Sequence, residues 1–180
     1  CARWICHFFE RTLAELSTSK MRWVCGVAWV IAANSRLSWS PRTQIVFLDF
    51  WIEFKDGKAV NFDAKAQRES LKSLIELDEG SSYLGEVALI SHDSPISNSN
   101  ILFYNTLFDE NASCHLALGR AYPMNVKGGT KMSSKELKDA GSNHSMAHSD
   151  FMFGSSEMQI VGTLEDNSIV VVFKNGNFVI

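Results

Sequence analysis

The stretch that decides the fold covers residues 85–122 and reads GEVALISHDSPISNSNILFYNTLFDENASCHLALGRAY. Residues 86–90 form a short apolar run that opens with a carboxylate, and such a run predicts a strand. The polar segment 92–97, HDSPIS, contains Pro95, which argues against a helix, so we expect a loop there. Residues 99–109 and 111–121 are predicted to be helical, with Asp109 or Asn111 as the candidate cap.

The chain on the N-terminal side of this stretch predicts a hairpin and a helix. Two β-rich runs, 50–54 and 59–62, flank the segment Lys55-Asp56-Gly57-Lys58, and an Asp-Gly pair between such runs is typical of a tight hairpin. Residues 63–78 carry leucine and isoleucine at spacings of three and four, which predicts an amphipathic helix that stops at Gly80.

The C-terminal side predicts a loop followed by strands. Residues 123–143 are rich in Gly, Lys and Ser, and we expect a loop with one helical turn near 133–139. The runs MQIVGTL, SIVVVFK and NFVI are predicted strands, separated by turns at EDNS and KNG. The expected fold class is therefore mixed α/β (α+β), with helices packed on a mixed or mainly antiparallel sheet.

Composition narrows the class of protein. The 180 residues are 46% hydrophobic and 21% charged, as in an ordinary globular chain, and the net charge of −3 argues against a nucleic-acid partner. No apolar run is long enough to span a membrane. The four cysteines, at positions 1, 6, 25 and 114, include no C-x-x-C pair, so they suggest neither a structural zinc site nor a disulfide framework. We therefore expect a reducing, cytoplasmic location.

Residues 1–48 differ in composition from residues 49–180. They hold four of the five tryptophans and three of the four cysteines, and their net charge is +4 against −7 for the rest. We interpret residues 1–48 as a foreign or frame-shifted segment joined to a partial domain at 49–180. The alternative is a genuine apolar N-terminal element that packs on the domain. Because the chain begins with Cys1, we expect it to be a fragment, although the text after Met21 also has the outline of a short signal peptide.

Five side chains are candidates for chemistry. His115 and Tyr122 are seven residues apart and would share one face of the predicted helix. His148 and Asp150 are two apart, a spacing that projects both from one side of an extended segment and suits zinc or cobalt. Glu86 on an apolar strand would need a cation or several donors if buried. Taken singly, each of these residues is more often an ordinary core or surface residue.

Four pieces of the sequence together carry a family resemblance: GEVAL, HDSPISNSNILFYNTLFDENA, CHLALGRAY, and HSDFMFGS at 148–155. In this order they resemble the thermophilic-type metallo-aminopeptidases (peptidase family M29), which include aminopeptidases T, S and II. The resemblance begins near Asp49 and continues to the C-terminus, so it implies the C-terminal, metal-binding half of such an enzyme.

The resemblance implies roles for the same five residues. Glu86, His115, His148 and Asp150 match metal ligands of the family, and Tyr122 matches its catalytic tyrosine. It further implies two divalent ions (zinc or cobalt, with magnesium or manganese as further candidates), an activated water that releases the N-terminal amino acid of a peptide, and a homodimer.

One family motif is missing from the sequence. The family's N-x-P-T-E-E segment, which supplies a further carboxylate ligand, does not occur in this chain. We therefore predict that the polypeptide by itself is weakly active or inactive. The alternative interpretation is a non-catalytic remnant or assembly domain of the same family.

Overall fold

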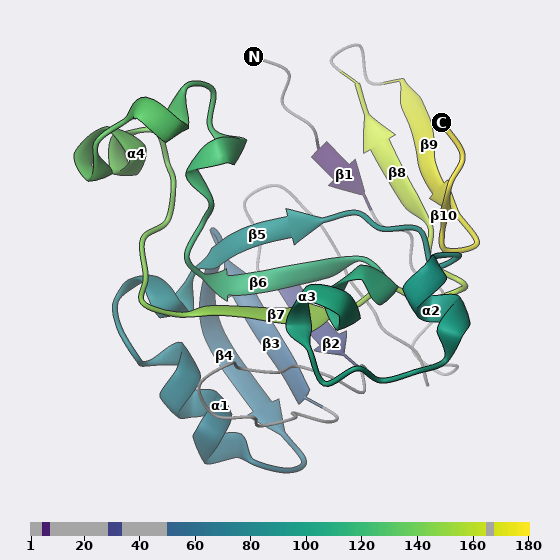
Figure 1. Cartoon of the computed structure of the whole chain (residues 1–180), viewed down its shortest axis with the longest axis horizontal. Helices are drawn as coiled ribbons and strands as arrows, with labels where there is room; N and C mark the ends of the chain where they lie inside the picture. The colour runs from purple at the N-terminus through teal and green to yellow at the C-terminus, as the bar shows by residue number, and fades with distance from the viewer. Residues whose placement is uncertain (1–4, 8–28, 34–49, 165–167) are drawn as a thin grey trace.

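The computed structural model describes residues 5–7, 29–33, 50–164 and 168–180, which form three antiparallel sheets bordered by short helices (Figure 1). The sheets have the strand orders β1-β8-β9-β10, β2-β3-β4 and β5-β6-β7. The strands are β1 (Ile5–His7), β2 (Trp29–Ala33), β3 (Phe50–Lys55), β4 (Lys58–Ala64), β5 (Leu84–Ala88), β6 (His115–Gly119), β7 (His148–Met152), β8 (Ile160–Thr163), β9 (Ile169–Lys174) and β10 (Asn177–Phe178). The helices are α1 (Arg68–Ile75), α2 (Pro95–Ser99), α3 (Thr106–Asp109) and α4 (Ser134–Asp139), with 3₁₀ turns η1 (Gly80–Ser82), η2 (Glu110–Ala112), η3 (Pro123–Asn125) and η4 (Gly129–Lys131). The mixed, mainly antiparallel α+β class is confirmed.

The β3–β4 hairpin forms where the sequence predicts it. Asp56 and Gly57 both have positive φ, 51° and 79°, as a type I′ turn requires. Along β3, alternate residues Phe50, Ile52 and Phe54 are buried, so one face of the strand is turned to the core.

The helix predicted within 63–78 is confirmed in shortened form as α1. Leu71 and Ile75, four residues apart, are its buried side chains, and they pack in the main core. That core draws on all three sheets and consists of Phe50, Ile52, Phe54, Leu71, Ile75, Cys114, Leu116, Leu118, Phe151, Phe153, Ile160 and Phe173. Burial of these side chains therefore holds the β5-β6-β7 sheet against β3 and α1.

The helix predicted at 111–121 is wrong. The segment begins with the 3₁₀ turn η2, becomes extended at Ser113, and then forms β6, the central strand of its sheet. All five residues of β6 are buried, so both faces of the strand are covered. A short apolar run of this kind shows no alternation, and periodicity alone cannot distinguish it from a buried helix.

Two further predictions around this strand are corrected. Pro95 does not exclude a helix but begins one: it occupies the first position of α2, where its missing N–H is not needed, and the Ser94 hydroxyl accepts a hydrogen bond from the Ser97 N–H at 3.1 Å. The helix predicted at 99–109 is limited to α3. Asn100 and Tyr104 have left-handed φ of 53°, which interrupts helical geometry between α2 and α3.

The C-terminal predictions are largely confirmed. The helical turn near 133–139 is α4, capped by Ser133 and Glu136, which form a capping box. The predicted strands are β8, β9 and β10, and Asn175 and Gly176 make the turn between the last two with φ of 51° and 73°. The turn predicted at EDNS lies outside the described residues except for Ser168.

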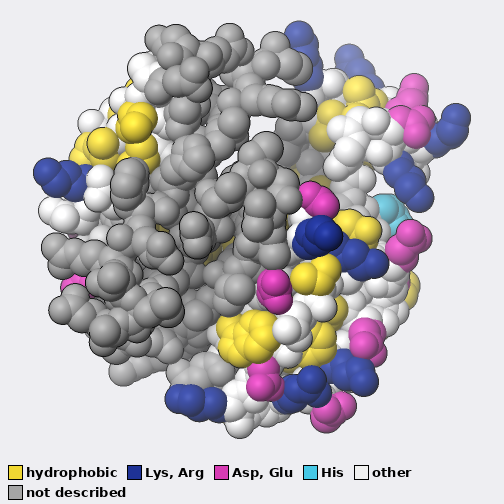
Figure 2. Space-filling model, turned by 180° about the vertical axis from the view of Figure 1, so that it is seen from behind, with side chains coloured by type: hydrophobic (Ala, Val, Ile, Leu, Met, Phe, Trp, Pro, Cys, Tyr) yellow, Lys and Arg dark blue, Asp and Glu magenta, His cyan; other side chains and the backbone are white. Residues whose placement is uncertain are grey.

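The predicted segment 1–48 is described only in its two short strands. β1 pairs with β8 and β2 pairs with β3, both antiparallel. In the described part of the chain, no helix is long and apolar enough to cross a membrane. Figure 2 shows the face opposite to that of Figure 1. On it, basic and acidic side chains of the described residues are interspersed, without a basic stripe of the kind that binds nucleic acid.

Candidate metal centre

One face of the β5-β6-β7 sheet collects the predicted ligands. Ala117, at the middle of β6, is paired with Glu86 on β5 and with Asp150 on β7. His115 lies two residues before Ala117, and His148 lies two residues before Asp150, so alternation along the strands places all four side chains on the same face as Ala117. The first and last of the four residues are 64 positions apart in the sequence, but their strands lie side by side in the sheet (Figure 1).

The functional atoms of these four side chains meet. His115 Nε2 lies 3.3 Å from Glu86 Oε1, and His148 Nε2 lies 3.6 Å from Glu86 Oε2 and 3.3 Å from Asp150 Oδ1. The ligand atoms of Glu86, His115 and Asp150 all lie within 4.8 Å of one another. The structure thus brings together every ligand that the sequence predicts.

The two imidazoles are oriented in the same way. Nδ1 of His115 lies 3.2 Å from the carbonyl oxygen of Ser113, and Nδ1 of His148 lies 2.7 Å from that of Arg120. A carbonyl only accepts, so each Nδ1 carries the hydrogen and each Nε2 faces the cluster. Backbone carbonyls commonly fix metal-binding histidines in this tautomer and orientation.

The cluster is buried and short of positive charge. The side chains of His115 and Asp150 are 4% exposed, and that of Glu86 is 20% exposed. Among the described residues, neither carboxylate forms an ion pair with lysine or arginine, and Asp150 Oδ1 is a buried oxygen without a hydrogen bond. Burying carboxylates is costly without a cation, so this donor set fits a divalent metal ion.

The pKa of His148 reflects the excess of negative charge in the cluster. Burial alone would lower the pKa of its imidazole, but Asp150, the Arg120 carbonyl and Glu86 outweigh burial and raise the pKa to about 9. Without another cation, the proton on His148 therefore partly compensates the two carboxylates.

Tyr122 lies beside the cluster, as predicted, but on an extended segment and not on the predicted helix. The segment after β6 is extended rather than helical, and Tyr122 precedes the turn η3. Its ring nevertheless packs on the His148 ring, with centroids 4.8 Å apart. Burial and then the negative charges of Asp150 and Glu86 raise the pKa of its phenol, so the hydroxyl stays protonated and can donate a hydrogen bond.

Glu110 lies near this site and was not among the residues predicted from the sequence. It begins η2, which packs against β7, and its side chain is partly buried. Burial first, and then the charges of Asp150 and Glu86, raise the pKa of Glu110, while the two histidines lower it. In the sequence Glu110 lies five residues before His115. Residues at that spacing share a face neither in a strand nor in a helix, so the pattern did not connect the two.

Neighbouring polar residues have structural roles. Asp109 accepts hydrogen bonds from the backbone N–H groups of Phe103 and Asn105, both at 2.9 Å, and so shapes the turn before α3. Cys114 is fully buried, its thiol lies 3.3 Å from the carbonyl oxygen of Ile90, and burial raises its pKa to about 11. A thiol with this pKa is neither a nucleophile nor a metal ligand at neutral pH.

Comparisons with known proteins agree with this geometry. Residues 35–178 match the family described as Thermophilic metalloprotease (M29). The chain is 49% identical over 153 residues to Aminopeptidase AmpS of Bacillus subtilis (strain 168), covering 85% of this chain and 37% of the relative. It is 50% identical over 129 residues to Aminopeptidase 2 of Geobacillus stearothermophilus, covering 72% of this chain and 31% of the relative.

A solved structure is also similar. Wild-type AmpT from Thermus thermophilus matches with a TM-score of 0.69 and 33% identity, over 85% of this chain and 39% of that chain. The chain therefore spans about a third of the length of the curated relatives that it matches.

Proposed function

The chain belongs to the thermophilic metalloprotease (M29) family, and on that premise we propose that it carries the metal-binding half of an aminopeptidase. The observation that carries the proposal is the meeting of Glu86, His115, His148 and Asp150 on one sheet face. Both imidazoles present Nε2 to the carboxylates while their Nδ1 atoms are held by backbone carbonyls. This mixed nitrogen and oxygen donor set suits zinc or cobalt, with magnesium or manganese as weaker candidates.

We assign the ligands as follows. Glu86 offers one oxygen toward each histidine, so Glu86, His115, His148 and Asp150 would together hold the divalent ions. Glu110 is a further carboxylate candidate, because it is partly buried on η2, which packs against β7. When bound, the two ions would supply an activated water and stabilise the negative charge that develops on the scissile carbonyl oxygen.

Tyr122 is the candidate catalytic residue that is not a ligand. Its phenol is protonated at neutral pH and its ring lies against His148, beside the cluster. A hydrogen bond from this hydroxyl would stabilise an oxyanion formed at the cluster. The carboxylates of the cluster would attract the free amino group of a peptide, which is the chemical basis for expecting cleavage at the N-terminus.

The activity of the complete relatives is not assigned to this chain by itself. It spans about a third of their length and contains no N-x-P-T-E-E segment, so we expect metal binding with little peptidase turnover. The family match begins at residue 35, and the division of the chain at residue 48 stays a prediction. A peptide substrate, a homodimer and a cytoplasmic location likewise stay predictions.

Metal content tests the proposal. The chain is loaded with zinc, dialysed and measured by plasma emission, alongside His148→Ala and the control His92→Ala. We expect bound zinc in the wild type and the control and a lower stoichiometry in His148→Ala. Leucine p-nitroanilide hydrolysis with added cobalt is measured in parallel, and robust turnover would contradict the expected low activity. Absence of bound zinc in the wild-type chain would favour the alternative, a non-catalytic remnant or assembly domain.

A further inference from the structure

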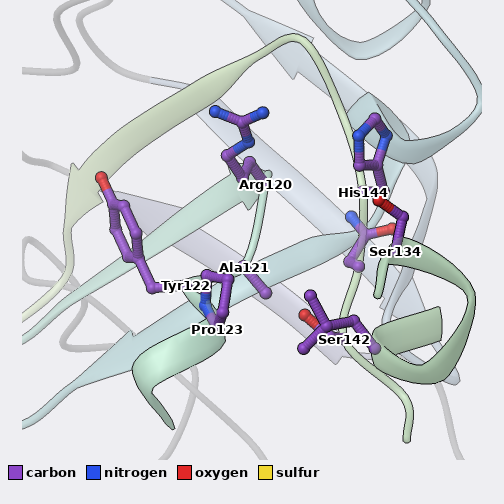
Figure 3. A pocket seen from close by; sticks show the side chains of 9 residues that line it. Arg120, Ala121, Tyr122, Pro123, Ser134, Ser142 and His144 are labelled. Carbon is purple, nitrogen blue, oxygen red and sulfur yellow. The ribbon is translucent and has the colours of Figure 1, made fainter. Parts of the chain in front are cut away.

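A cavity of about 350 Å³ lies beside Tyr122 (Figure 3), whose ring also packs on His148 of the ligand cluster. Its lining comes from the segment after β6, from α4 and from residues 142–144. In the view of Figure 3 the Arg120 guanidinium lies between the Tyr122 ring and His144. The lining residues include this arginine, one histidine and two serines, and no carboxylate.

The cavity and the cluster therefore have opposite charge. The cluster collects carboxylates, whereas among the described residues that line the cavity only Arg120 carries a full positive charge. Among the described residues, no carboxylate forms an ion pair with the Arg120 guanidinium. Arg120 is exposed, and since no described carboxylate pairs with it, its guanidinium is accessible to an anionic group of a ligand.

Backbone hydrogen bonds of Arg120 connect the cavity to the ligand cluster. Its N–H donates to the carbonyl oxygen of Ala147 at 2.7 Å, and its own carbonyl accepts from His148 Nδ1 at 2.7 Å. The part of the wall formed by residues 142–144 is also fixed, since Asn143 Nδ2 donates to the carbonyl oxygens of Gly80 and Gly119 at 2.8 and 2.7 Å. The cavity is thus a preformed part of the fold rather than a gap in a loose loop.

The cavity and the ligand cluster adjoin each other. The rings of Tyr122 and His148 are 4.8 Å apart, and Tyr122 also lines the cavity, so the cavity adjoins the cluster at Tyr122. An extended dipeptide spans at most about 7 Å. A dipeptide with its amino group at the cluster would therefore bring its carboxylate to the cavity.

We propose that this cavity binds the C-terminal carboxylate of dipeptides through Arg120, and that it favours dipeptides over longer or C-terminally blocked peptides. The proposal rests on the proposed function, because it takes the cluster as the place where the peptide amino group binds. The planar guanidinium suits a carboxylate, with which it forms two parallel hydrogen bonds.

Binding of a dipeptide that cannot be hydrolysed tests the proposal. The probe is Leu-Leu with the peptide carbonyl reduced to methylene, compared with the same compound as its C-terminal amide. Affinities are measured by isothermal titration calorimetry on the metal-free and the zinc-loaded chain. We expect the carboxylate form to bind about tenfold more tightly than the amide.

Two variants assign the difference to Arg120. Arg120→Gln should remove the preference for the carboxylate form, and the control Lys135→Gln, which removes a nearby positive charge on α4, should retain it. In ¹⁵N-labelled chain the amide signals of Leu137 and Ser142, which line the cavity, should shift on binding the carboxylate form. Equal affinity of the wild type for both forms, no binding of either form, or an undiminished preference in Arg120→Gln would overturn the proposal.

Two further comparisons separate the alternatives. A probe with its only carboxylate on a glutamate side chain and a blocked C-terminus should bind as weakly as the amide; tight binding would overturn the assignment to the C-terminal carboxylate. Zinc content is measured on the same samples. A chain that binds no zinc but keeps the Arg120-dependent preference would contradict the proposed metal function and leave the carboxylate site supported, and the reverse result would do the opposite.

Discussion

The two faces of the β5-β6-β7 sheet are built from alternating residues of the same strands but have opposite chemistry. On one face Leu116, Leu118 and Phe151 are almost fully buried and join the core. On the other face Glu86 and Asp150 flank Ala117, with the two histidines beside them. The apolar face holds the sheet in place, and the ionic face holds buried charge that only a cation would fully compensate.

This difference shows how a small sheet can carry a costly site. Because side chains alternate along a strand, Phe151 packs in the core while its neighbour Asp150 points into the ligand cluster. We therefore expect substitutions on the apolar face to change stability and substitutions on the ionic face to change metal affinity.

The largest expected effect is on the apolar face. Phe151 is 2% exposed and packs edge-on against Phe50, with ring centroids 5.9 Å apart. Phe151→Ala should lower the free energy of unfolding by about 3–5 kcal/mol, through lost burial and the cavity left behind. Urea unfolding of the metal-free chain measures this, with Phe151→Leu as the milder control. A loss below about 1 kcal/mol would show that this face does not hold the sheet.

The next effect is on the ionic face. Asp150→Asn should weaken zinc binding at least about 100-fold, equivalent to about 2.8 kcal/mol, because a neutral amide replaces a buried carboxylate ligand. Competition with a chromophoric chelator measures the affinity. The matched control is Ser149→Ala, one residue away on the other face, which should leave zinc affinity unchanged. Equal effects of the two substitutions would contradict the division between faces.

A smaller effect is expected where the two carboxylates meet. Ala117 is fully buried between Glu86 and Asp150, and its small side chain leaves room for the ligand atoms. Ala117→Leu should weaken zinc binding by about tenfold and cost about 1–3 kcal/mol by overpacking. Ala117→Ser, which is nearly the same size, is the control. Full zinc affinity in Ala117→Leu would place the ion elsewhere.

The smallest effect concerns the segment that leads into β7. Asp78 accepts hydrogen bonds from Ser81 N–H at 2.8 Å, Ser145 Oγ at 2.9 Å and Met146 N–H at 2.7 Å. Partial burial acts to raise the pKa of Asp78, but these donors outweigh it and hold the pKa below its ordinary value. Asp78→Asn should cost about 1 kcal/mol at pH 7.

The pH dependence of this effect has a definite sign. Because the pKa is lower in the folded state, the unfolded state binds more protons, and the contribution of Asp78 is fully present above about pH 3.9. It is lost as the pH falls from there through the folded-state pKa. Unfolding measured at pH 7 and pH 3 should therefore show a smaller difference between wild type and Asp78→Asn at pH 3, and a larger difference there would contradict this assignment.

The sequence predicts the parts of the fold that local chemistry decides. The β3–β4 hairpin follows from Asp56 and Gly57, which tolerate positive φ, and α1 follows from Leu71 and Ile75. The strand β6 was not predictable in this way, because its burial on both faces removes the alternation that marks a strand. Tertiary contacts, not local preference, decide its conformation.

The candidate site was accessible from the sequence only in part. His148 and Asp150 have a spacing that suits a strand, but Glu86 and His115 could be joined to them only through the family resemblance. Glu110 was missed because a 3₁₀ turn, rather than a regular element, brings it toward β7. Arg120 could not be identified from the sequence, because the cavity that it lines forms between segments that are distant in the chain.

A cobalt titration is the most direct test of a metal site formed by the four side chains. Cobalt(II) is added to the metal-free chain and its visible absorption is recorded, for the wild type and for the double variant His115→Ala/His148→Ala. We predict saturable absorption bands typical of nitrogen and oxygen ligands, without the charge-transfer band of a thiolate, and their loss in the double variant. A wild-type chain that produces no bands, or a double variant that keeps them, would contradict this prediction.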